Sequence, residues 1–525
     1  MKPRKPLELD GRTGEGGGQL VRIACVLAAV TSQPIRIHHV RGNRPGPRGG
    51  GLKPQHVTAI QWLANATEAE VFGLEVGSHT LEFRPTVPPP RAQLGGQEEQ
   101  QSRRRRSRSR IISIEAGSGA ASAILIFQAV FPFLLFAGSS DEPEQEQEQE
   151  QEQEPPIELS IHGGTNVSFS PSYEYLDQVL LPALQSHFGI RVSRRLERRR
   201  WSQGSSPSQP KGTIWFRFRP LRPGQTLKLS SSSPLSSLAR PSSPPLTRRR
   251  RRRREPHEIA HIDVSILAPT AVLAPLERAI TRNLEAGGRF CRAAKEVRFV
   301  VTEDSGHDAR LYALLVAVSE TTEIETETGT GTGTEMGALR WGRDWLYNRT
   351  VKRKTPEQLA DEIARRVCRD LEMELSGDGG DGGDGDGDGR GVVDEYLQDQ
   401  LVVFQALAEG RTSFPRSSGL SPSPVDDGGG GGGGYGDAEE DESEGESEDL
   451  EPAVERLDIG ESEEEDGKGE KSDEEGRVRR DKMHKPFGEG STHTRTARWV
   501  ASELLPGVQW FNGGSICDGV GLSFK

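Results

Sequence analysis

The sequence has few cysteines, and their spacing argues against two classes of structure. There are four in 525 residues, and no two stand at CxxC spacing. Small secreted domains are dense in cysteine, and zinc sites use closely spaced cysteine pairs. We therefore expect neither a disulfide framework nor a zinc site, and we expect a reducing compartment. The cysteines are Cys25, Cys291, Cys368 and Cys517.

The sequence also lacks a long hydrophobic run. Its longest apolar stretch, Ala120 to Ala137, contains Gln128 and Pro132 and is typical of a buried helix rather than a membrane span. The first residues, MKPRKPLELDG, contain no apolar segment of the kind found in secretory signals. We expect a soluble intracellular protein with no membrane partner.

Hydrophobic residues are scarce as well. They make up 33% of the chain, beside 62 glycines and 34 prolines, and the net charge of −12 is divided into acidic and basic blocks. Segments with so few apolar side chains cannot bury a core. Roughly 330 to 350 residues remain for folded structure, about the size of one large and one small domain. We expect disordered inserts near 88–110, 139–156, 376–391 and 415–490, and low-complexity segments near 225–255 and 321–336.

The richest motif is the stretch from Leu7 to Leu27, LELDGRTGEGGGQLVRIACVL. Its pattern predicts a short strand, a turn packed with glycine and a helix that begins near Gln19. Glycine has no Cβ, so backbone N–H groups in the turn can approach an anion, which the positive helix end also attracts. Glu15 and Arg22 add a candidate metal ligand and a candidate phosphate clamp. Taken alone, a tight turn without a ligand explains the motif equally well, because it is neither a dinucleotide fingerprint nor a P-loop.

Two further segments extend the pattern. Arg41 and Arg44 stand in RGNRPGP after an expected strand at 35–40, and LKPQH precedes an expected helix at 56–66. The turn GEGGGQ, followed by a strand, RxxRPxP and LxPQH, resembles the RNA 3′-terminal phosphate cyclase family. This chain carries extra glycines at 49–51. The resemblance covers the residues that remain once the biased inserts are removed.

The next strand–turn–helix unit resembles the same family. It consists of a strand at 111–114, the turn Gly117-Ser118-Gly119 and an apolar helix at 120–131 that carries Gln128. The family has a glutamine at this place. The turn departs from the family pattern at Ala121, where a second glycine is expected.

The resemblance continues through a third block. A strand at 157–162 ends in GGTN, and Pro171 precedes an expected helix at 173–185. A basic strand then follows at 191–200. The family has an aromatic residue and PxGGG there, whereas this chain has Trp201 and a Ser/Pro-rich spacer.

The stretch DEYLQDQL, at 394–401, matches the family block of tyrosine, leucine, any residue, aspartate and glutamine. On a helix Tyr396, Asp399 and Gln400 are three and four residues apart, so they share one face. A ring, a carboxylate and an amide on one face suit stacking on adenine, orienting a metal or an imidazole, and contacting polar edges. An ordinary helix with exposed polar residues explains the spacing too. The resemblance makes these three, with Gln128 and Pro171, the candidate ATP-binding residues.

The sequence STHT begins the last expected helix, at 492–505. In the family, a histidine at this place is the nucleophile that becomes adenylylated. Attack on the α-phosphate of ATP needs a neutral imidazole, and a helix N-terminus disfavours the imidazolium form. His493 is therefore the candidate catalytic residue, and a surface histidine is the alternative.

Charged residues near the glycine turn complete the candidate site. Arg22, Arg41 and Arg44 are candidate contacts for phosphates of ATP or of an RNA end, because guanidinium groups bind phosphate in bidentate fashion. A solvated basic loop would explain Arg41 and Arg44 as well. Glu15 is the candidate ligand for a divalent metal, Mg or Mn.

The resemblance implies an α/β fold: a large domain of repeated β-α-β-α-β-β units with a smaller inserted α/β domain. We expect the large domain at 1–220 and 350–525 and the small one at 221–349. Elements expected in the second half of the chain are strands at 261–267, 297–302, 309–318, 508–511 and 519–524, and helices at 271–284, 355–375 and 393–407.

The function implied is ATP-dependent conversion of an RNA 3′-terminal phosphate to a 2′,3′-cyclic phosphodiester, through a histidine–AMP intermediate and an RNA-adenylate. ATP and a divalent metal would be the cofactors, and RNA with a 3′-phosphate end the partner. Arginine runs at 103–110 and 248–254 indicate nuclear import or nonspecific RNA contact, and place the protein in the nucleus with the cytoplasm as a second location. They are equally compatible with drift in tolerated surface loops.

Two alternative functions stay open. Cyclase-like proteins are non-catalytic factors in ribosomal RNA processing and ribosome assembly, and they share the fold but lack the histidine. His493 favours the enzyme, whereas Ala121 and the missing PxGGG turn favour the assembly factor. The second alternative is a generic RNA-binding protein that acts through its arginine runs.

Overall fold

The computed structural model describes residues 4–524, apart from 45–48, 93, 95–109, 139–153, 207, 231–232, 234–257, 289–290, 292–293, 321–322, 325–333, 336, 349–350, 352–353, 377–390 and 417–487. Most of the predicted inserts and nearly all of both arginine runs lie outside the described residues. The described part is mixed α/β, as predicted. Every helix in it is too short or too polar to span a bilayer.

Two four-stranded sheets share one topology. In the order β1-β2-β4-β3 and again in β5-β6-β8-β7, the first pair is parallel and the other two pairs are antiparallel. Each sheet therefore comes from one β-α-β-α-β-β unit, which confirms the predicted repeat. The first unit contains β1 (Leu7–Asp10), α1 (Gly18–Thr31), β2 (Ile35–His38), α2 (Pro54–Thr67), β3 (Glu70–Phe72) and β4 (Thr80–Arg84). The second contains β5 (Arg110–Glu115), α3 (Ala123–Leu135), β6 (Ile157–Gly163), α4 (Tyr173–Tyr175), the π-helical turn η2 (Leu176–Leu180), α5 (Leu181–Phe188), β7 (Val192–Arg198) and β8 (Gly212–Phe218).

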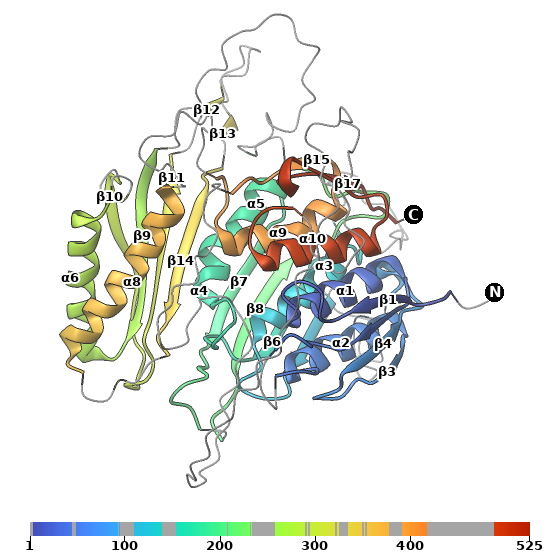
Figure 1. Ribbon diagram of the computed structural model, residues 1–525, viewed down its shortest axis with the longest axis horizontal. Coiled ribbons are helices and arrows are strands. Elements are labelled where there is room, and N and C mark those ends of the chain that lie inside the picture. Colours follow the sequence, from blue (N-terminus) through green and yellow to red (C-terminus); the bar gives the residue numbers. More distant parts are fainter. Residues whose placement is uncertain are drawn as a thin grey trace, which may run out of the picture.

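A third sheet, in the order β10-β9-β11-β14, lies beside the second unit (Figure 1). Helices α6 and α8 pack against each other and against this sheet. Its elements are β9 (Ile259–Ala268), α6 (Thr270–Ala286), β10 (Glu296–Asp304), β11 (Tyr312–Ser319), β14 (Arg340–Leu346) and α8 (Pro356–Ser376). A small pair, β12 (Glu323–Ile324) and β13 (Thr334–Glu335), branches from it. The division of the chain into domains stays a prediction.

The rest of the described chain adds two helices and an antiparallel sheet in the order β15-β17-β16. The elements are α9 (Glu395–Leu407), β15 (Glu409–Ser413), α10 (Thr492–Leu504), β16 (Gln509–Phe511), a 3-10 turn at 512–514 and β17 (Ile516–Val520). The strand predicted at 519–524 is wrong by three residues at its start and four at its end, since β17 spans Ile516–Val520. It ends there because Gly521 takes a left-handed backbone with φ of 61° and turns the chain out of the ladder.

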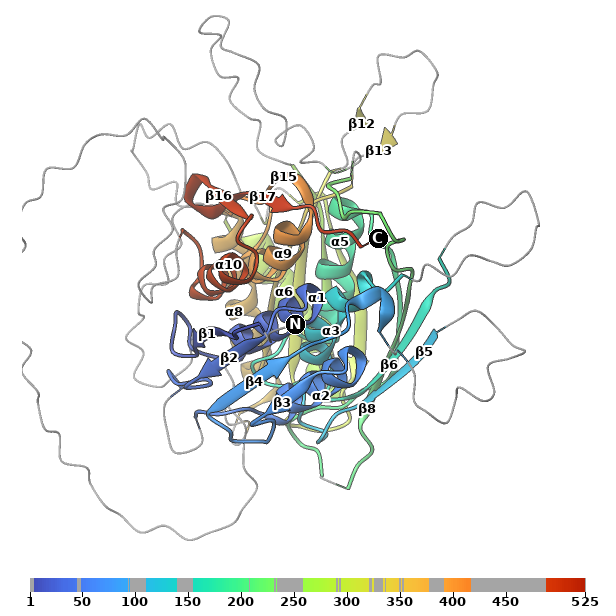
Figure 2. The same cartoon turned by 90° about the vertical axis from the view of Figure 1, so that its right-hand side faces the viewer.

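Helix α1 lies at the centre of the arrangement that forms the site. It packs against α2, α3 and α10, and α9 packs against α10 and α3 (Figures 1 and 2). Nearly every residue of α1 is buried, including Gln19 in its first turn. The start of α1 therefore faces α9 and α10, although these helices are hundreds of residues apart in the chain.

Candidate functional site

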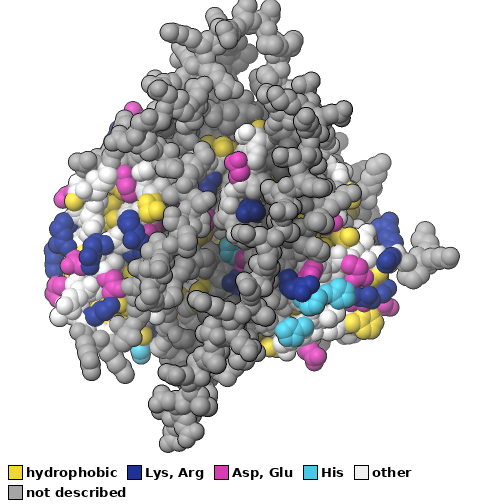
Figure 3. Space-filling view, in the orientation of Figure 1, with side chains coloured by type: hydrophobic (Ala, Val, Ile, Leu, Met, Phe, Trp, Pro, Cys, Tyr) yellow, Lys and Arg dark blue, Asp and Glu magenta, His cyan; other side chains and the backbone are white. Residues whose placement is uncertain are grey.

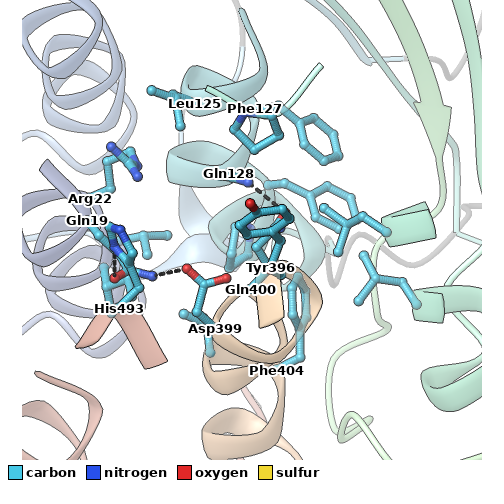
Figure 4. Close-up of a pocket in the computed structure, with 18 of the residues that line it drawn as sticks. Gln19, Arg22, Leu125, Phe127, Gln128, Tyr396, Asp399, Gln400, Phe404 and His493 are labelled. Atoms are coloured by element: carbon cyan, nitrogen blue, oxygen red, sulfur yellow. Dashed lines mark hydrogen bonds between the residues drawn. The ribbon is translucent and has the colours of Figure 1, made fainter. Parts of the chain in front are cut away.

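A pocket opens where α1, α3, α9 and α10 meet (Figure 4). Its lining combines apolar side chains from α1, α3 and α9 with polar side chains. In Figure 4, Gln19 lies between His493 and Asp399, with Arg22 beside them, while Tyr396 and Gln400 lie close to Gln128. The predicted site residues that line this pocket are Arg22, Gln128, Pro171, Tyr396, Asp399, Gln400 and His493.

His493 is the second residue of α10 and lies two residues after the N-terminal cap, Ser491. The Ser491 hydroxyl caps the helix by accepting a hydrogen bond from the Thr494 backbone N–H at 3.1 Å. The His493 imidazole is 21% exposed, and its Nδ1 lies 3.2 Å from Gln19 Oε1. The ring therefore lies at the N-terminal end of α10, where the helix dipole carries positive partial charge.

The Gln19 side chain connects His493 to Asp399. Gln19 Nε2 donates to Asp399 Oδ2 at 2.6 Å, which leaves its Oε1 to accept from His493 Nδ1. This contact favours the tautomer with the proton on Nδ1, so that Nε2 carries the lone pair. The three side chains thus orient the imidazole through its Nδ1.

Asp399 is half-buried in the pocket beside this chain of contacts, and its Oδ1 atom is buried. Burial raises the pKa of its carboxyl group to about 8, although the positive charge of Arg22 and the hydrogen bond from Gln19 oppose the shift. Oδ1 has no hydrogen-bond partner among the described residues. In the ligand-free protein the carboxyl group is therefore largely protonated at neutral pH, and it can offer a hydrogen bond to a ligand from Oδ1.

Glu15 and Arg44 lie next to His493 without lining the pocket. The glycine turn is anchored to α10, because the Glu15 backbone N–H donates to Thr496 Oγ1 at 2.9 Å. Glu15 Oε1 forms an ion pair with Arg44, and Oε2 lies 3.7 Å from His493 Nδ1. Gly16 needs its small size here: its φ is 62°, and a Cβ would come within 2.5 Å of Asn43.

Arg41 lies outside the lining of the pocket. It is fully buried, has a φ of 54°, and donates from Nη1 to the Gly51 carbonyl at 3.3 Å. It is not among the pocket-lining residues, and its predicted contact with a phosphate or an RNA end stays a prediction. His56 caps α2, since its Nδ1 accepts from the Lys53 backbone N–H at 3.1 Å.

The three residues predicted to share a face of α9 do share it, as all line the pocket. Asp394 caps this helix by accepting from the backbone N–H groups of Tyr396 and Leu397, both at 2.9 Å. Gln128 Nε2 donates to Gln400 Oε1 at 2.8 Å and so joins α3 to α9. Burial raises the pKa of the Tyr396 hydroxyl, so the ring stays neutral.

Sequence reasoning missed Gln19 as a site residue. The motif GEGGGQ contained it, and a polar residue at the start of an otherwise apolar helix was the available signal. The aromatic part of the wall was missed as well, because Phe127, Phe131 and Phe404 look like ordinary core residues in the sequence. As for metals, the described residues hold no group of three or more His, Cys, Asp or Glu side chains that could bind one.

Comparison with known proteins adds a second line of support. A family model described as RNA 3′-terminal phosphate cyclase matches residues 13–422, a range that includes α9 and ends before α10. An RNA 3′-terminal phosphate cyclase of Drosophila melanogaster is 25% identical over 415 residues, which are 79% of this chain and 86% of the relative. Proteins of the same name from Desulfurococcus amylolyticus and Thermococcus gammatolerans are 37% and 35% identical over 193 residues, 37% of this chain. The aligned part spans 43% and 44% of those two relatives.

Proposed function

Because the chain belongs to the RNA 3′-terminal phosphate cyclase family, we propose that it converts an RNA 3′-phosphate to a 2′,3′-cyclic phosphodiester with His493 as the nucleophile. Membership implies ATP and RNA as substrates. The observation that carries the proposal is the contact of His493 with Gln19 and, through it, with Asp399. It supports an imidazole that is oriented through Nδ1 and lines the pocket.

The first step proposed is attack of His493 Nε2 on the α-phosphorus of ATP. A nitrogen–phosphorus bond forms, the bond to the β-phosphate oxygen breaks, and pyrophosphate leaves. The base would lie on Tyr396 with Pro171 on its other side, and the Gln128–Gln400 pair would meet its polar edge. Arg22 lines the same pocket and would offset the charge of the phosphates.

Two transfers follow in the proposal. An oxygen of the RNA 3′-phosphate attacks the phosphorus of the histidine-bound AMP, the nitrogen–phosphorus bond breaks, and an RNA-adenylate forms. The neighbouring 2′-hydroxyl then attacks the RNA phosphorus, loses its proton, and displaces AMP. Arg44 would act on these phosphates, and its ion pair with Glu15, which in turn lies near His493, supports that role.

A divalent metal, Mg or Mn, would supply charge neutralisation at the phosphates. Magnesium sites commonly use one or two carboxylates and take their remaining ligands from phosphates and water. Glu15 fits such a role as a partial ligand, because Oε2 is the oxygen that is not paired with Arg44.

The rival functions differ in what they require of His493. A non-catalytic assembly factor does not need an oriented imidazole, so the contacts of His493 favour the enzyme. A generic RNA-binding protein would act through its arginine runs, which lie almost entirely outside the described residues. On the face shown in Figure 3, described acidic and basic side chains are interspersed rather than gathered by sign. A nuclear location remains part of the proposal, to be checked by imaging a tagged chain with and without 248–254.

The deciding experiment is incubation with α-labelled ATP and a divalent metal. The wild-type chain should retain AMP through an acid-labile, base-stable bond, as expected of a phosphoramidate. His493→Ala should retain none and should lose cyclisation, because no neighbouring group can replace the imidazole. His38→Ala is the matched control: that histidine is exposed on β2, contacts Glu8, and should be dispensable. A folded wild-type chain that takes up no label would contradict the enzyme and favour the non-catalytic assembly factor.

A further inference from the structure

Four charged side chains from separate parts of the chain form a mostly buried network, and one of them, Glu395, also lines the pocket. Arg343 on β14 pairs with Glu374 near the end of α8, and its Nη2 lies 3.3 Å from Glu395 at the start of α9. Arg416, after β15, pairs with Glu374 and Glu395 at 3.1 Å each. The side chains of the two arginines are 8% and 7% exposed, and that of Glu374 is 1% exposed. Two positive and two negative charges balance one another.

Arg343 differs from Arg416 in one further contact. Its guanidinium carbon lies over the ring of Tyr396, 4.5 Å from the ring centroid. The edge contact with Tyr175, at 6.1 Å and 74° between the ring planes, restricts the same ring from another side. Tyr396 lines the pocket, so the orientation of its ring determines what can stack on it.

The strand β14 also holds the start of α9 through its backbone. The N–H of Gly342, the residue before Arg343, donates to Asp394 Oδ2 at 2.8 Å, and Asp394 is the cap of α9. A Cβ on Gly342 would come within 2.8 Å of the Tyr175 ring, so a glycine fits where a larger residue would push that ring away. Two successive residues of β14 thus determine where α9 begins and how its first aromatic ring is turned.

We propose that Arg343 is a positioning residue for the nucleotide base and acts through Tyr396. The proposal rests on the function proposed above, since it assumes that a base stacks on this ring. A planar guanidinium over one face of the ring holds it by a cation–π contact and leaves the other face for a base. Glu374 and Glu395 in turn hold the guanidinium in place.

The third sheet thereby contributes to the site without lining the pocket. None of the residues that line the pocket belongs to β9, β10, β11 or β14. The sheet contributes instead through Arg343, which touches a lining residue from behind. A purely structural ion pair with the carboxylates could use any cationic side chain. Positioning the Tyr396 ring needs the flat guanidinium.

The test compares Arg343→Lys with Arg416→Lys in the full chain. Both variants keep the charge and lose the fork geometry toward Glu374 and Glu395, so both weaken the same network. Only Arg343→Lys loses the flat group over Tyr396. By calorimetric titration we expect Arg343→Lys to raise the Kd for ATP about fivefold, and Arg416→Lys to leave it within about twofold. The rate of adenylylation at saturating ATP should stay within about twofold in both.

A double-mutant cycle assigns the effect to the ring. Combined with Tyr396→Leu, Arg343→Lys should add nothing to the Kd of Tyr396→Leu alone, since the group it acts through is gone. Equal changes of Kd in the two lysine variants, or additive effects in the cycle, would overturn the role of Arg343. A wild-type chain that binds ATP while Arg343→Lys binds equally well would overturn this inference alone. A folded wild-type chain that binds no ATP would overturn the proposed function together with it.

Discussion

The buried carboxyl group of Asp399 makes stability depend on pH in a direction opposite to that of most acidic residues. Its pKa is about 8 in the folded protein, against 3.8 for an ordinary aspartate. Between these two values the folded state keeps a proton that the unfolded state has lost. The free energy of unfolding therefore falls as pH rises through this window, and the fall ends near pH 8.

The size of the effect follows from the width of that window. Each unit of pKa difference is worth about 1.4 kcal/mol, so at pH 7 burial of Asp399 costs about 4 kcal/mol. Whole domains are stabilised by only about 5–15 kcal/mol. Asp399→Asn keeps the shape and has no ionisable proton to lose. The variant should be more stable than the wild type by an amount that grows from pH 5 to pH 8 and reaches a few kcal/mol at pH 7.

Urea unfolding, followed by tryptophan fluorescence at several pH values from about 5 to 8.5, measures this difference. The matched control is Asp361→Asn, which removes a surface ion pair with Arg282 and should shift the whole curve by about 1 kcal/mol or less. Parallel pH profiles for Asp399→Asn and the wild type would refute the reasoning. The same variant should slow adenylylation at least about tenfold, because the introduced amide can donate to Gln19. The Gln19 side chain would then turn over and present its Nε2 to His493 in place of its Oε1.

Three further outcomes test the surroundings of the site. Gly17→Ala places a Cβ within 2.2 Å of the Glu15 carboxylate, and should reduce AMP labelling about tenfold or more while circular dichroism stays unchanged. Arg44→Ala removes the ion pair with Glu15 and should raise the KM for ATP or RNA about tenfold, without abolishing the histidine adenylate. Replacing 417–487 with a short Gly-Ser linker should leave cyclisation within about twofold, since that stretch has too few apolar residues to contribute a core. Loss of cyclisation in a folded linker variant would contradict the last expectation.

Local patterns predicted the parts of the site that a single helix or turn determines. The shared face of Tyr396, Asp399 and Gln400 follows from spacings of three and four residues, and the start of α1 follows from the glycine turn. Spacing could not show that Gln19 contacts His493, because 474 residues separate the two. Neither the burial that raises the pKa of Asp399 nor the stacking of Arg343 is written in any local stretch.

The strand predicted at 519–524 shows how an alternating pattern misleads. Val520, Leu522 and Phe524 alternate with small or polar residues, which is typical of a half-buried strand. Gly521 nevertheless ends the ladder, and Phe524 packs edge-on against Phe136 in another element. A single left-handed glycine therefore outweighed the period of the side chains. The predicted roles of Arg41 and of the arginine runs stay predictions.

The position of α10 in the chain has a consequence for biosynthesis. At the usual rates of about 5–20 residues per second, roughly 25 to 95 seconds separate the synthesis of α1 from that of α10. During that interval the face of α1 that later packs against α10 stays uncovered on the ribosome, and the pocket lacks the wall that carries His493. Nascent chains should therefore depend on chaperones at this face, and they should be unable to hold AMP covalently until α10 has docked.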